Sequence, residues 1–390
     1  MRANSSYCKI VVLHIITGLS TGGAERMLCN LLSRLNRMRF EPVVVSLMDR
    51  GTLGDHIEAL GIPVHTIGMK PGMPPTPAAI WRLSHIVRQL KPDLIQGWMY
   101  HGNLAAQFAS VCLFQNVPVF WGIHHSINSL NSEKKMTIAL IKLGANLSKF
   151  PNNIVFVSRT SKSMHEAIGY CSKNSCVIPN GFDTSLFRPS IEARSTIRSE
   201  LGLPEKTNLI GLIGRYHPMK DHANFLQAAA LISKVCSDIH FLLVGPKVDR
   251  ENQILHHLIQ ELRLFAQIHL LGERSDMPRL TAALDIVSSS SAYGEAFPLV
   301  VGEAMSCSVP CVVTDVGDSG WIVGNTGRVV PSRNPEALAN AWKELIALGL
   351  EGRETLGRAA RERIIEYFAL DSVVAQYEAL YENALVKQLS

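Results

Sequence analysis

The segment KIVVLHIIT, Lys9–Thr17, followed by AERMLCNLLSRLNR, Ala24–Arg37, carries the clearest fold signal in the chain. The first segment is a nearly continuous run of Val, Ile and Leu, which is typical of a strand buried on both faces. In the second segment apolar residues recur at intervals of three and four, which predicts an amphipathic helix. A buried strand followed directly by a helix is the building unit of a parallel sheet covered by helices on both sides.

The same order of strand and helix recurs along the chain in two series. The first series ends near residue 157 and the second begins near residue 208. Two series of this kind predict two doubly wound, Rossmann-like α/β domains. Further strands are expected at Pro42–Leu47, Val64–Ile67, Leu94–Gly97, Pro118–Ile123 and Ile154–Val157, and then at Asn208–Gly214, Ile239–Gly245, Gln267–Gly272, Asp285–Ser289 and Pro310–Thr314.

A length of 390 residues also favours two domains over one. The segment VIPNGFDTSLFRP, residues 177–189, is the expected boundary, because its prolines bracket an Asn-Gly turn. From about Glu351 the chain is helical in pattern to its end. We therefore predict an N-terminal domain at residues 1–180, a C-terminal domain at 181–368 and a terminal helix at 369–390.

The composition is that of a soluble globular protein, with 47% hydrophobic and 18% charged residues. No apolar run reaches the roughly 20 residues of a membrane span, and no cleavage pattern of a signal peptide follows the start. The eight cysteines have no framework spacing. These features predict a cytoplasmic protein with reduced thiols.

The charge is divided unevenly between the two halves. Residues 1–180 carry 18 Lys and Arg against 8 Asp and Glu, whereas residues 181–390 carry 20 against 25. A basic N-terminal half favours an anionic partner, and an uneven solvated surface is the alternative. The segment Asn131–Phe150 is expected to be a helix that mixes four lysines with aliphatic residues. Such a helix fits peripheral contact with an anionic membrane, or an ordinary surface position. Nucleic acid is not expected as a partner, because basic and aromatic residues are not interleaved.

Two pairs of charged residues are the main candidates for a functional site. Glu295 and Glu303 are separated by seven residues, and Glu303 is expected at the start of a helix. Arg215 ends a predicted strand, and Lys220 follows one loop later. Two cations can bind a diphosphate, and two carboxylates can accept hydrogen bonds from sugar hydroxyls. The four residues together predict a site for a nucleotide sugar.

Two further candidates follow strands of the N-terminal half. Gly22 and Gly23 lie between the first strand and the first helix, where glycine lets a ligand approach the backbone and the helix start favours anions. The alternative interpretation is that Gly22 and Gly23 form only an ordinary turn at the start of a helix. His124 and His125 follow the fifth predicted strand and could bind phosphate, sugar or an acceptor. Adjacent residues point apart on a strand, so a metal site is not expected there.

These segments resemble the GT-B glycosyltransferases of family 4, a retaining group that includes bacterial polysaccharide and lipid-sugar transferases. The resemblance covers nearly the whole chain. The segment most specific to the family is GEAFPLVVGEAMSCSVP, which is similar to its E-x7-E block. GGAER, IPNGFD, GRYHPMKDH and GNTGRVVP are similar to its N-terminal glycine loop, its interdomain segment, its G-R-x3-x-K-G pattern and the loop that closes its nucleotide site.

The resemblance implies a fold of two domains with a cleft between them and a C-terminal helix that crosses back to the N-terminal domain. It implies that Arg215 and Lys220 bind the donor diphosphate, that Glu303 binds the ribose and that Glu295 binds the donor sugar. His124 would lie near the sugar and the attacking hydroxyl. The remaining donor contacts that it implies are Gly22, Gly23, Ala296, Phe297 and Leu299.

The chain departs from the family pattern at three positions. Ala296 and Pro298 stand where the family usually has glycines, and proline lacks the N–H that often faces the sugar. Ser308 stands where glycine is usual. The sequence alone does not choose between His124 and His125.

The expected function is therefore sugar transfer from a UDP- or GDP-sugar to an acceptor hydroxyl, with retained anomeric configuration. The acceptor would be a glycolipid or oligosaccharide of cell-surface polysaccharide or glycolipid synthesis. No DxD motif is present, so we expect no metal ion and no further cofactor. A nucleotide-sugar epimerase on the same fold and a non-catalytic nucleotide-sugar-binding protein are the alternatives.

Overall fold

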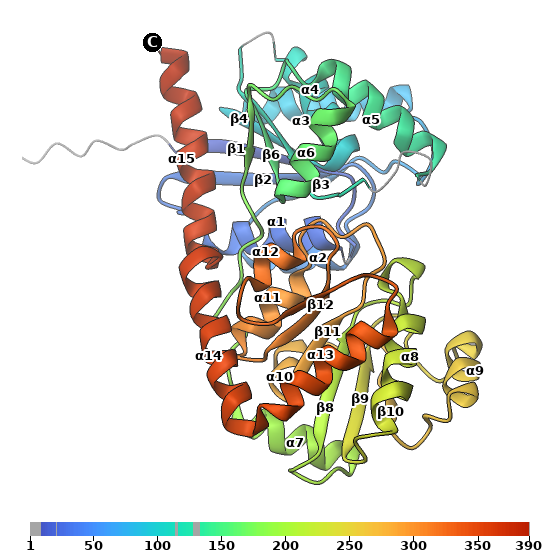
Figure 1. The fold of residues 1–390 in the computed structure, drawn as a ribbon. Coiled ribbons are helices and arrows are strands. Elements are labelled where there is room, and N and C mark those ends of the chain that lie inside the picture. The colour runs from blue at the N-terminus through green and yellow to red at the C-terminus, as the bar shows by residue number, and fades with distance from the viewer. Residues whose placement is uncertain (1–8, 21, 114–115, 128–132, 390) are drawn as a thin grey trace, which may run out of the picture. The chain divides into compact units, whose positions relative to one another are not determined.

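The computed structural model describes residues 9–20, 22–113, 116–127 and 133–389, and the chain forms two compact units. Unit 1 contains the residues up to Gly181 together with those from Leu370 onward, and unit 2 is Phe182–Ala369. The last helix of the chain therefore belongs to unit 1, although the whole of unit 2 precedes it in the sequence (Figure 1).

Unit 1 is built on a seven-stranded sheet in the order β3-β2-β1-β4-β5-β6-β7. All strand pairings described in it are parallel. Parallel strands need crossover connections, and helices supply most of them. The strands are β1 Ile10–Ile16, β2 Phe40–Ser46, β3 Val64–Thr66, β4 Leu94–Trp98, β5 Val119–Ile123, β6 Asn153–Phe156 and β7 Ser175–Val177.

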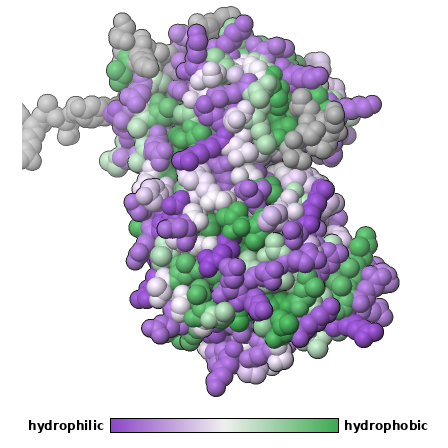
Figure 2. Space-filling view, in the orientation of Figure 1, coloured by the Kyte–Doolittle hydropathy of each residue, from purple (hydrophilic) through white to green (hydrophobic). Residues whose placement is uncertain are grey.

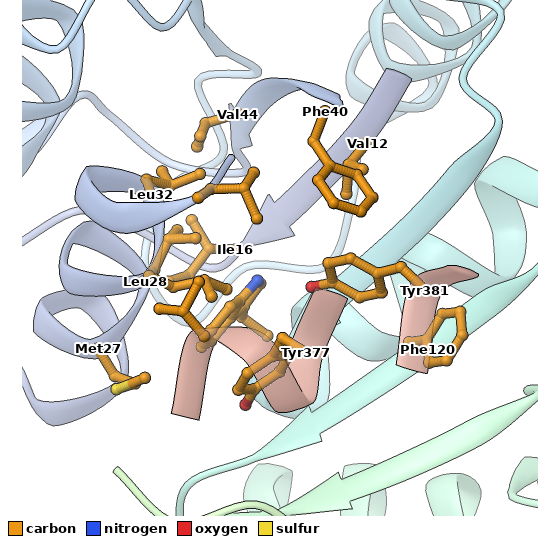
Figure 3. Close-up of a cluster of buried hydrophobic side chains, with 14 of the residues drawn as sticks. Val12, Ile16, Met27, Leu28, Leu32, Phe40, Val44, Phe120, Tyr377 and Tyr381 are labelled. Carbon is orange, nitrogen blue, oxygen red and sulfur yellow. The ribbon is translucent and has the colours of Figure 1, made fainter. Parts of the chain in front are cut away.

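Hydrophobic clusters cover both faces of this sheet. One cluster joins the sheet to α1, α2 and α15, and part of it is drawn in Figure 3, where Tyr381 of α15 lies beside Phe40 and Phe120. The other cluster joins the sheet to α3, α4 and α5. The helices of unit 1 are α1 Gly23–Arg34, α2 Gly51–Ala59, α3 Pro77–Leu90, α4 Met99–Val111, α5 Lys135–Leu147, α6 Arg159–Ile168 and α15 Leu370–Leu389.

Unit 2 repeats the architecture with six parallel strands in the order β10-β9-β8-β11-β12-β13. Its strands are β8 Asn208–Ile213, β9 Ile239–Val244, β10 Ile268–Leu270, β11 Ile286–Ser289, β12 Cys311–Thr314 and β13 Arg328–Val330. Its helices are α7 Ile191–Leu201, α8 His222–Ser233, α9 Gln253–Glu261, α10 Met277–Ala282, α11 Leu299–Ser306, α12 Ser319–Val323, α13 Pro335–Ala347 and α14 Gly349–Tyr367, and a short 3-10 helix, η2, covers Pro218–Lys220.

The strands expected from the sequence are all present, with ends that differ by at most two residues, and the doubly wound α/β class is confirmed. Two strands were missed, β7 and β13. Each has three residues and lies at the edge of its sheet, where a short strand lacks the long apolar run that marks the central ones. The helix expected at Asn131–Phe150 is shorter, because α5 begins at Lys135 and ends at Leu147. Its expected start at Asn131 lies outside the described residues.

None of the helices in the described ranges combines the length and the hydropathy that crossing a bilayer requires. The described cysteines are free thiols. In the face shown in Figure 2, green hydrophobic patches lie among purple hydrophilic ones.

Candidate functional site

The strand order creates a switch point in each sheet. The order of strands reverses between β1 and β4 in unit 1 and between β8 and β11 in unit 2. Loops at the carboxyl ends of the two central strands diverge there, and this is where doubly wound sheets bind ligands. Most of the predicted site residues follow β1 and β5 in unit 1 and β8 and β11 in unit 2.

The connection after β8 brings Lys220 to the switch point of unit 2. Gly214 leaves room for the lysine stem, because a Cβ at that position would lie only 3.3 Å from Lys220 Cε. Asp221 follows in the left-handed region, with φ 49°, and its carboxylate accepts a hydrogen bond of 3.1 Å from the Asn224 backbone N–H. Aspartate tolerates this conformation and caps α8. Lys220, the last residue of η2, is therefore held directly before a capped helix.

The loop after β11 is fastened to the loop after β8. The hydroxyl of Ser290 donates to the Lys220 carbonyl at 2.8 Å, and the Ala292 backbone N–H donates to the Met219 carbonyl at 2.8 Å. Gly294 has φ 76°, and a Cβ there would lie 3.0 Å from Met219 Sδ. The turn therefore needs glycine for its conformation and for its close approach to the neighbouring loop.

These loops bring Lys220 and Glu295 into a direct ion pair. Lys220 Nζ donates to Glu295 Oε1, and the Ser291 hydroxyl donates to the same oxygen at 2.7 Å. The side-chain exposures are 16% for Lys220 and 9% for Glu295. Burial opposes ionisation of Glu295, but the charge and hydrogen bond of Lys220, the hydroxyl of Ser291 and the charge of Arg215 leave the pKa of this carboxyl below its usual value.

Arg215 is exposed and lies two residues after the end of β8. Its charge contributes to the lowered pKa of Glu295, so it lies near the pair. A lysine ammonium has three N–H donors, of which the contact with Glu295 uses one. Arg215 and Lys220 therefore present two cations beside a buried carboxylate, an arrangement that can bind a diphosphate and a hydroxyl side by side.

Glu303 lies on α11, which follows the Glu295 loop, but it does not start that helix as expected from the sequence. The helix begins at Leu299, with Pro298 as its N-cap at φ −69°, so Glu303 occupies the second turn and is half-buried. The fixed φ of proline suits a helix start, which explains why α11 begins immediately after it. A position in the second turn leaves the helix start itself without a carboxylate.

Two of the neighbouring candidates have buried side chains. Ala296 is buried, and Phe297 packs its ring against those of Phe182, Trp321 and Phe368, with centroid distances of 5.5–6.1 Å. The Phe297 ring therefore belongs to the core of unit 2, and only its backbone can face a ligand. Leu299 is half-buried at the first position of α11.

The two glycines of unit 1 have no conformational need to be glycine. Gly22 is the N-cap of α1 with φ −146°, an extended conformation open to any residue. A Cβ on Gly23 would meet nothing within 4 Å. The open space at the start of a twelve-residue helix, α1, fits close approach by an anionic group.

The structure separates the roles of the two adjacent histidines of unit 1. The His125 ring is engaged by Tyr100, whose hydroxyl lies 3.2 Å from Nδ1, and by Glu133, whose carboxylate lies 3.4 Å from Nε2. Neither ring nitrogen of His124 makes a hydrogen bond of good geometry within the described residues, although both are buried. Burial lowers the pKa of His124 to about 4, against the opposing effect of hydrogen bonding from the nearby Asn180 side chain. His124 is thus neutral and has the capacity for new hydrogen bonds.

Several residues around these positions were not singled out by the sequence analysis. Ser290 and Ser291 belong to the serine run before Tyr293. His14 lies in a predicted strand and Trp98 directly follows another, and a His within an apolar run is the only signal. Pairing of β1 with β4 makes them neighbours, which the sequence does not reveal.

Among the described residues no group of three or more His, Cys, Asp or Glu side chains is arranged to hold a metal ion. The expectation of metal-independent chemistry stays a prediction.

Two family profiles match the chain and together span most of it. The profile described as Glycosyltransferase Family 4 matches residues 21–186, and the profile described as Glycosyl transferases group 1 matches residues 193–363. The first profile lies within the N-terminal half and carries Gly22, Gly23 and His124. The second carries Arg215, Lys220, Glu295 and Glu303.

Curated relatives are similar over part of the chain. The Escherichia coli UDP-Gal:alpha-D-GlcNAc-diphosphoundecaprenol alpha-1,3-galactosyltransferase is 26% identical over 216 residues, which cover 54% of this chain and 55% of that protein. The Bacillus anthracis N-acetyl-alpha-D-glucosaminyl L-malate synthase is 29% identical over 192 residues, covering 48% and 49%. The chain spans about half the length of these curated relatives.

Solved structures match the fold over nearly the whole chain. The Anabaena protein HepE in complex with UDP has a TM-score of 0.84 at 23% identity and covers 96% of this chain and 100% of that one. A glycosyltransferase from Rickettsia africae has a TM-score of 0.83 at 20% identity, covering 98% and 100%. At these identities the likeness establishes the fold, which is that of the GT-B glycosyltransferases.

Proposed function

Because the chain belongs to glycosyltransferase family 4, as the two profiles that match residues 21–186 and 193–363 show, we propose that it transfers a sugar from a UDP-sugar to an acceptor hydroxyl. The acceptor is a glycolipid or oligosaccharide of cell-surface polysaccharide or glycolipid synthesis. The observation that carries the proposal is the buried Lys220–Glu295 pair beside Arg215 at the switch point of unit 2.

The choice of UDP is supported by the relatives. The Escherichia coli enzyme is named for UDP-Gal, and HepE was solved with UDP and with UDP-glucose. GDP is the competing nucleotide. The name of the Escherichia coli enzyme also supports a lipid-diphosphate sugar as acceptor.

The proposed donor contacts follow from the chemistry of each residue. Arg215 and Lys220 bind the diphosphate, and Glu303 accepts hydrogen bonds from the ribose. Glu295 accepts a hydrogen bond from a hydroxyl of the donor sugar, since its lowered pKa keeps it ionised. The backbones of Ala296, Phe297 and Leu299 line the sugar.

In unit 1, Gly22 and Gly23 let the diphosphate and sugar approach the start of α1. His124 contacts the sugar or the attacking hydroxyl.

The proposed reaction retains the anomeric configuration. The acceptor oxygen forms a bond to the anomeric carbon on the face from which the diphosphate departs, and the bond between that carbon and the phosphate oxygen breaks. The departing β-phosphate takes the acceptor proton, so the products are the glycoside and UDP. Lys220 and Arg215 stabilise the negative charge that develops on the phosphate, a contribution of roughly 10²–10³ in rate for each well-placed donor. No metal or further cofactor takes part in this proposal.

The test is calorimetric binding of UDP, GDP and ADP with and without EDTA, followed by incubation with UDP-glucose and UDP-galactose. We expect micromolar binding of UDP that EDTA leaves unchanged, and slow release of UDP from one of the two sugars with water as acceptor. Interconversion of the two sugar nucleotides without release of UDP would instead identify an epimerase. Binding without any turnover, also in the presence of undecaprenyl-diphosphate sugars, would identify a binding protein, and no nucleotide binding would reject the site.

We further propose that unit 1 contacts an anionic membrane surface through α5 and its flanking residues. Met136, Leu143 and Phe150 are exposed by 54%, 47% and 61%. Four exposed lysines surround them, which combines apolar anchors with charges that attract anionic headgroups. The lysines are Lys134, Lys135, Lys142 and Lys149.

Sedimentation with vesicles tests this contact. The protein should sediment with phosphatidylglycerol vesicles and not with phosphatidylcholine vesicles. Each lysine near an anionic surface contributes about 1 kcal/mol, so K135E/K142E/K149E should lower the affinity roughly 100-fold. The matched control is K206E/K234E/K343E, which reverses three exposed lysines of unit 2. Equal losses in both triple variants would mean that net charge alone, and not this face, determines binding.

A further inference from the structure

The half-buried His124 stacks on buried aromatic rings of unit 1. Its imidazole lies over the indole of Trp98, with ring centroids 5.1 Å apart and planes inclined by 23°. The Trp98 indole is also nearly parallel to the Tyr377 ring of α15, at 6.3 Å and 19°. Trp98 has no exposed surface. Its place in the core therefore fixes the plane in which the His124 imidazole lies.

His14 in turn holds the Trp98 indole. Trp98 Nε1 donates a hydrogen bond of 3.2 Å to His14 Nδ1. An indole N–H can only donate, so His14 Nδ1 carries no proton and the imidazole proton is on Nε2. His14 has no exposed surface, and burial lowers its pKa to about 3. The imidazole is thus neutral and remains an acceptor for Trp98 over the whole physiological pH range.

A missing side chain leaves space for this arrangement. Gly122 pairs with Trp98 across β4 and β5. A Cβ at Gly122 would lie 3.3 Å from Gln96 Nε2 and 3.7 Å from His124 Nε2. Gln96, in turn, is the register partner of His14 on the neighbouring strand. A row of polar groups therefore runs through the sheet interior from His14 to His124, where apolar side chains would be expected.

Contacts among the described residues leave part of the hydrogen-bonding capacity of this polar row unused, although the Asn180 side chain lies close enough to His124 to raise its pKa by hydrogen bonding. Within the described residues, His14 Nε2, Gln96 Oε1 and both His124 ring nitrogens have no partner of good geometry. Leucine at position 14 would fill the same fully buried strand position without leaving a buried polar atom unpaired. The hydrogen bond to Trp98 is what the histidine adds, and the indole connects it to His124.

We propose that His14 and Trp98 are positioning residues, which fix the orientation of the His124 imidazole for its contact with the sugar or the attacking hydroxyl. This inference rests on the proposed function, because it assumes that His124 serves the transfer reaction. His14 and Trp98 are buried behind the imidazole and touch no substrate. Their effect on the reaction passes through His124.

The test compares H14L with H14N. Leucine removes the acceptor and keeps an apolar filling, whereas asparagine can place an amide oxygen where Nδ1 was. For release of UDP from UDP-glucose we expect H14L to lower kcat roughly 10- to 100-fold, as displaced catalytic groups do, with KM for UDP-glucose little changed. H14N should recover most of the loss. In an H124A background, H14L should cause no further decrease, because both changes remove the same contribution.

W98F is the second variant, in case H14L does not fold. It keeps a ring under His124 but removes the N–H that His14 holds, and we expect the same selective loss of kcat. W121F is its matched control, since Trp121 is also buried on a neighbouring strand of unit 1 but packs in the hydrophobic cluster on the other face of the sheet from Trp98. Equal losses of kcat in W98F and W121F would show only general damage to the core and would overturn the proposal.

An NMR measurement separates failure of this inference from failure of the proposed function. The imidazole signals of His124 in the free protein should shift in H14L and return toward their wild-type position in H14N. Unshifted His124 signals in H14L overturn the inference, whichever sugar nucleotide is the donor. If the signals shift but wild-type protein releases no UDP from any UDP-sugar, the positional coupling stands and the proposed reaction is rejected.

Discussion

In the buried Lys220–Glu295 ion pair, each side chain compensates the charge of the other. The two side chains are largely buried, and burial alone would make Glu295 harder to ionise. Removal of one partner from a buried pair leaves the other charge uncompensated, which typically costs about 3–5 kcal/mol unless the remaining group changes its protonation. Glu295 can take up a proton, so its response to the loss of Lys220 depends on pH.

The variant K220M tests this dependence while keeping most of the lysine stem against Gly214. We expect turnover to fall by roughly 10² or more, because the diphosphate loses a positioned cation. The pKa of Glu295 should rise, since the charge that lowers it is gone. Relative to wild type, K220M should therefore be least stable at high pH and recover as the pH falls through the raised pKa.

The double variant K220M/E295Q provides the control for stability. It removes the buried charge, so it should unfold at a higher urea concentration than K220M at pH 8 while remaining inactive. K234A, which truncates an exposed lysine of unit 2, should leave both activity and stability near wild type. Wild-type turnover in K220M would show that Lys220 does not bind the diphosphate.

At the scale of elements, α15 completes a core whose other members lie at the opposite end of the sequence. Tyr381 is fully buried, and its ring meets Phe40 of β2 and Phe120 of β5 edge to face, at 6.1 and 5.6 Å. These contacts join the last helix to strands of the first 123 residues. Unit 1 should therefore not reach its full stability without the end of the chain.

The pair Y381A and Y381F tests the contribution of α15. Y381A should cost about 3–5 kcal/mol in free energy of unfolding, as large-to-small aromatic changes do. Y381F should be neutral or stabilising, because the phenol oxygen is buried without a hydrogen-bond partner among the described residues. Urea denaturation measures both. A large loss in Y381F would mean that the hydroxyl has a partner, for example a buried water, that matters to the fold.

At the scale of the whole molecule, both units contain buried or half-buried histidines that are neutral in the folded state. Burial is the largest cause of the lowered pKa in each case. In the unfolded chain these residues titrate near 6.5, so between that pH and the folded pKa the unfolded state binds more protons. The contribution of these histidines to the free energy of unfolding is thus most favourable above pH 6.5 and decreases on acidification. The residues are His14, with its pKa near 3, and His124, His165, His222 and His269, each with a pKa of about 4.

His14 provides a direct check of this pH dependence. Holding it neutral at pH 5 rather than pH 7.5 should cost about 2 kcal/mol, since one pKa unit corresponds to 1.36 kcal/mol. H14L removes this cost. The stability of H14L relative to wild type should therefore improve by about that amount between pH 7.5 and pH 5 in urea denaturation. A difference that does not change with pH would show that His14 is protonated in the folded protein.

The pattern of residues was enough to predict the strands and the residues at their carboxyl ends. Continuous apolar runs such as Lys9–Thr17 mark buried parallel strands because both faces of the sheet are covered, and local periodicity records that burial. Arg215 and the two histidines were found because they directly follow such runs, Lys220 because it lies one loop later, and Glu295 because of its spacing to Glu303. Two of the four three-residue edge strands, β7 and β13, were missed, since an edge position needs no long apolar signal.

Contacts between distant segments could not be read from the sequence. The Lys220–Glu295 pair forms because β8 and β11 are neighbours at the switch point, although 75 residues separate the two side chains. The distinction between His124 and His125 depends on tertiary contacts, because the His125 ring contacts Tyr100 and the His124 ring stacks on Trp98. Local preferences shape each strand and helix, but the order in which strands pair is set by burial across the whole sheet, and that order selects the side chains that meet.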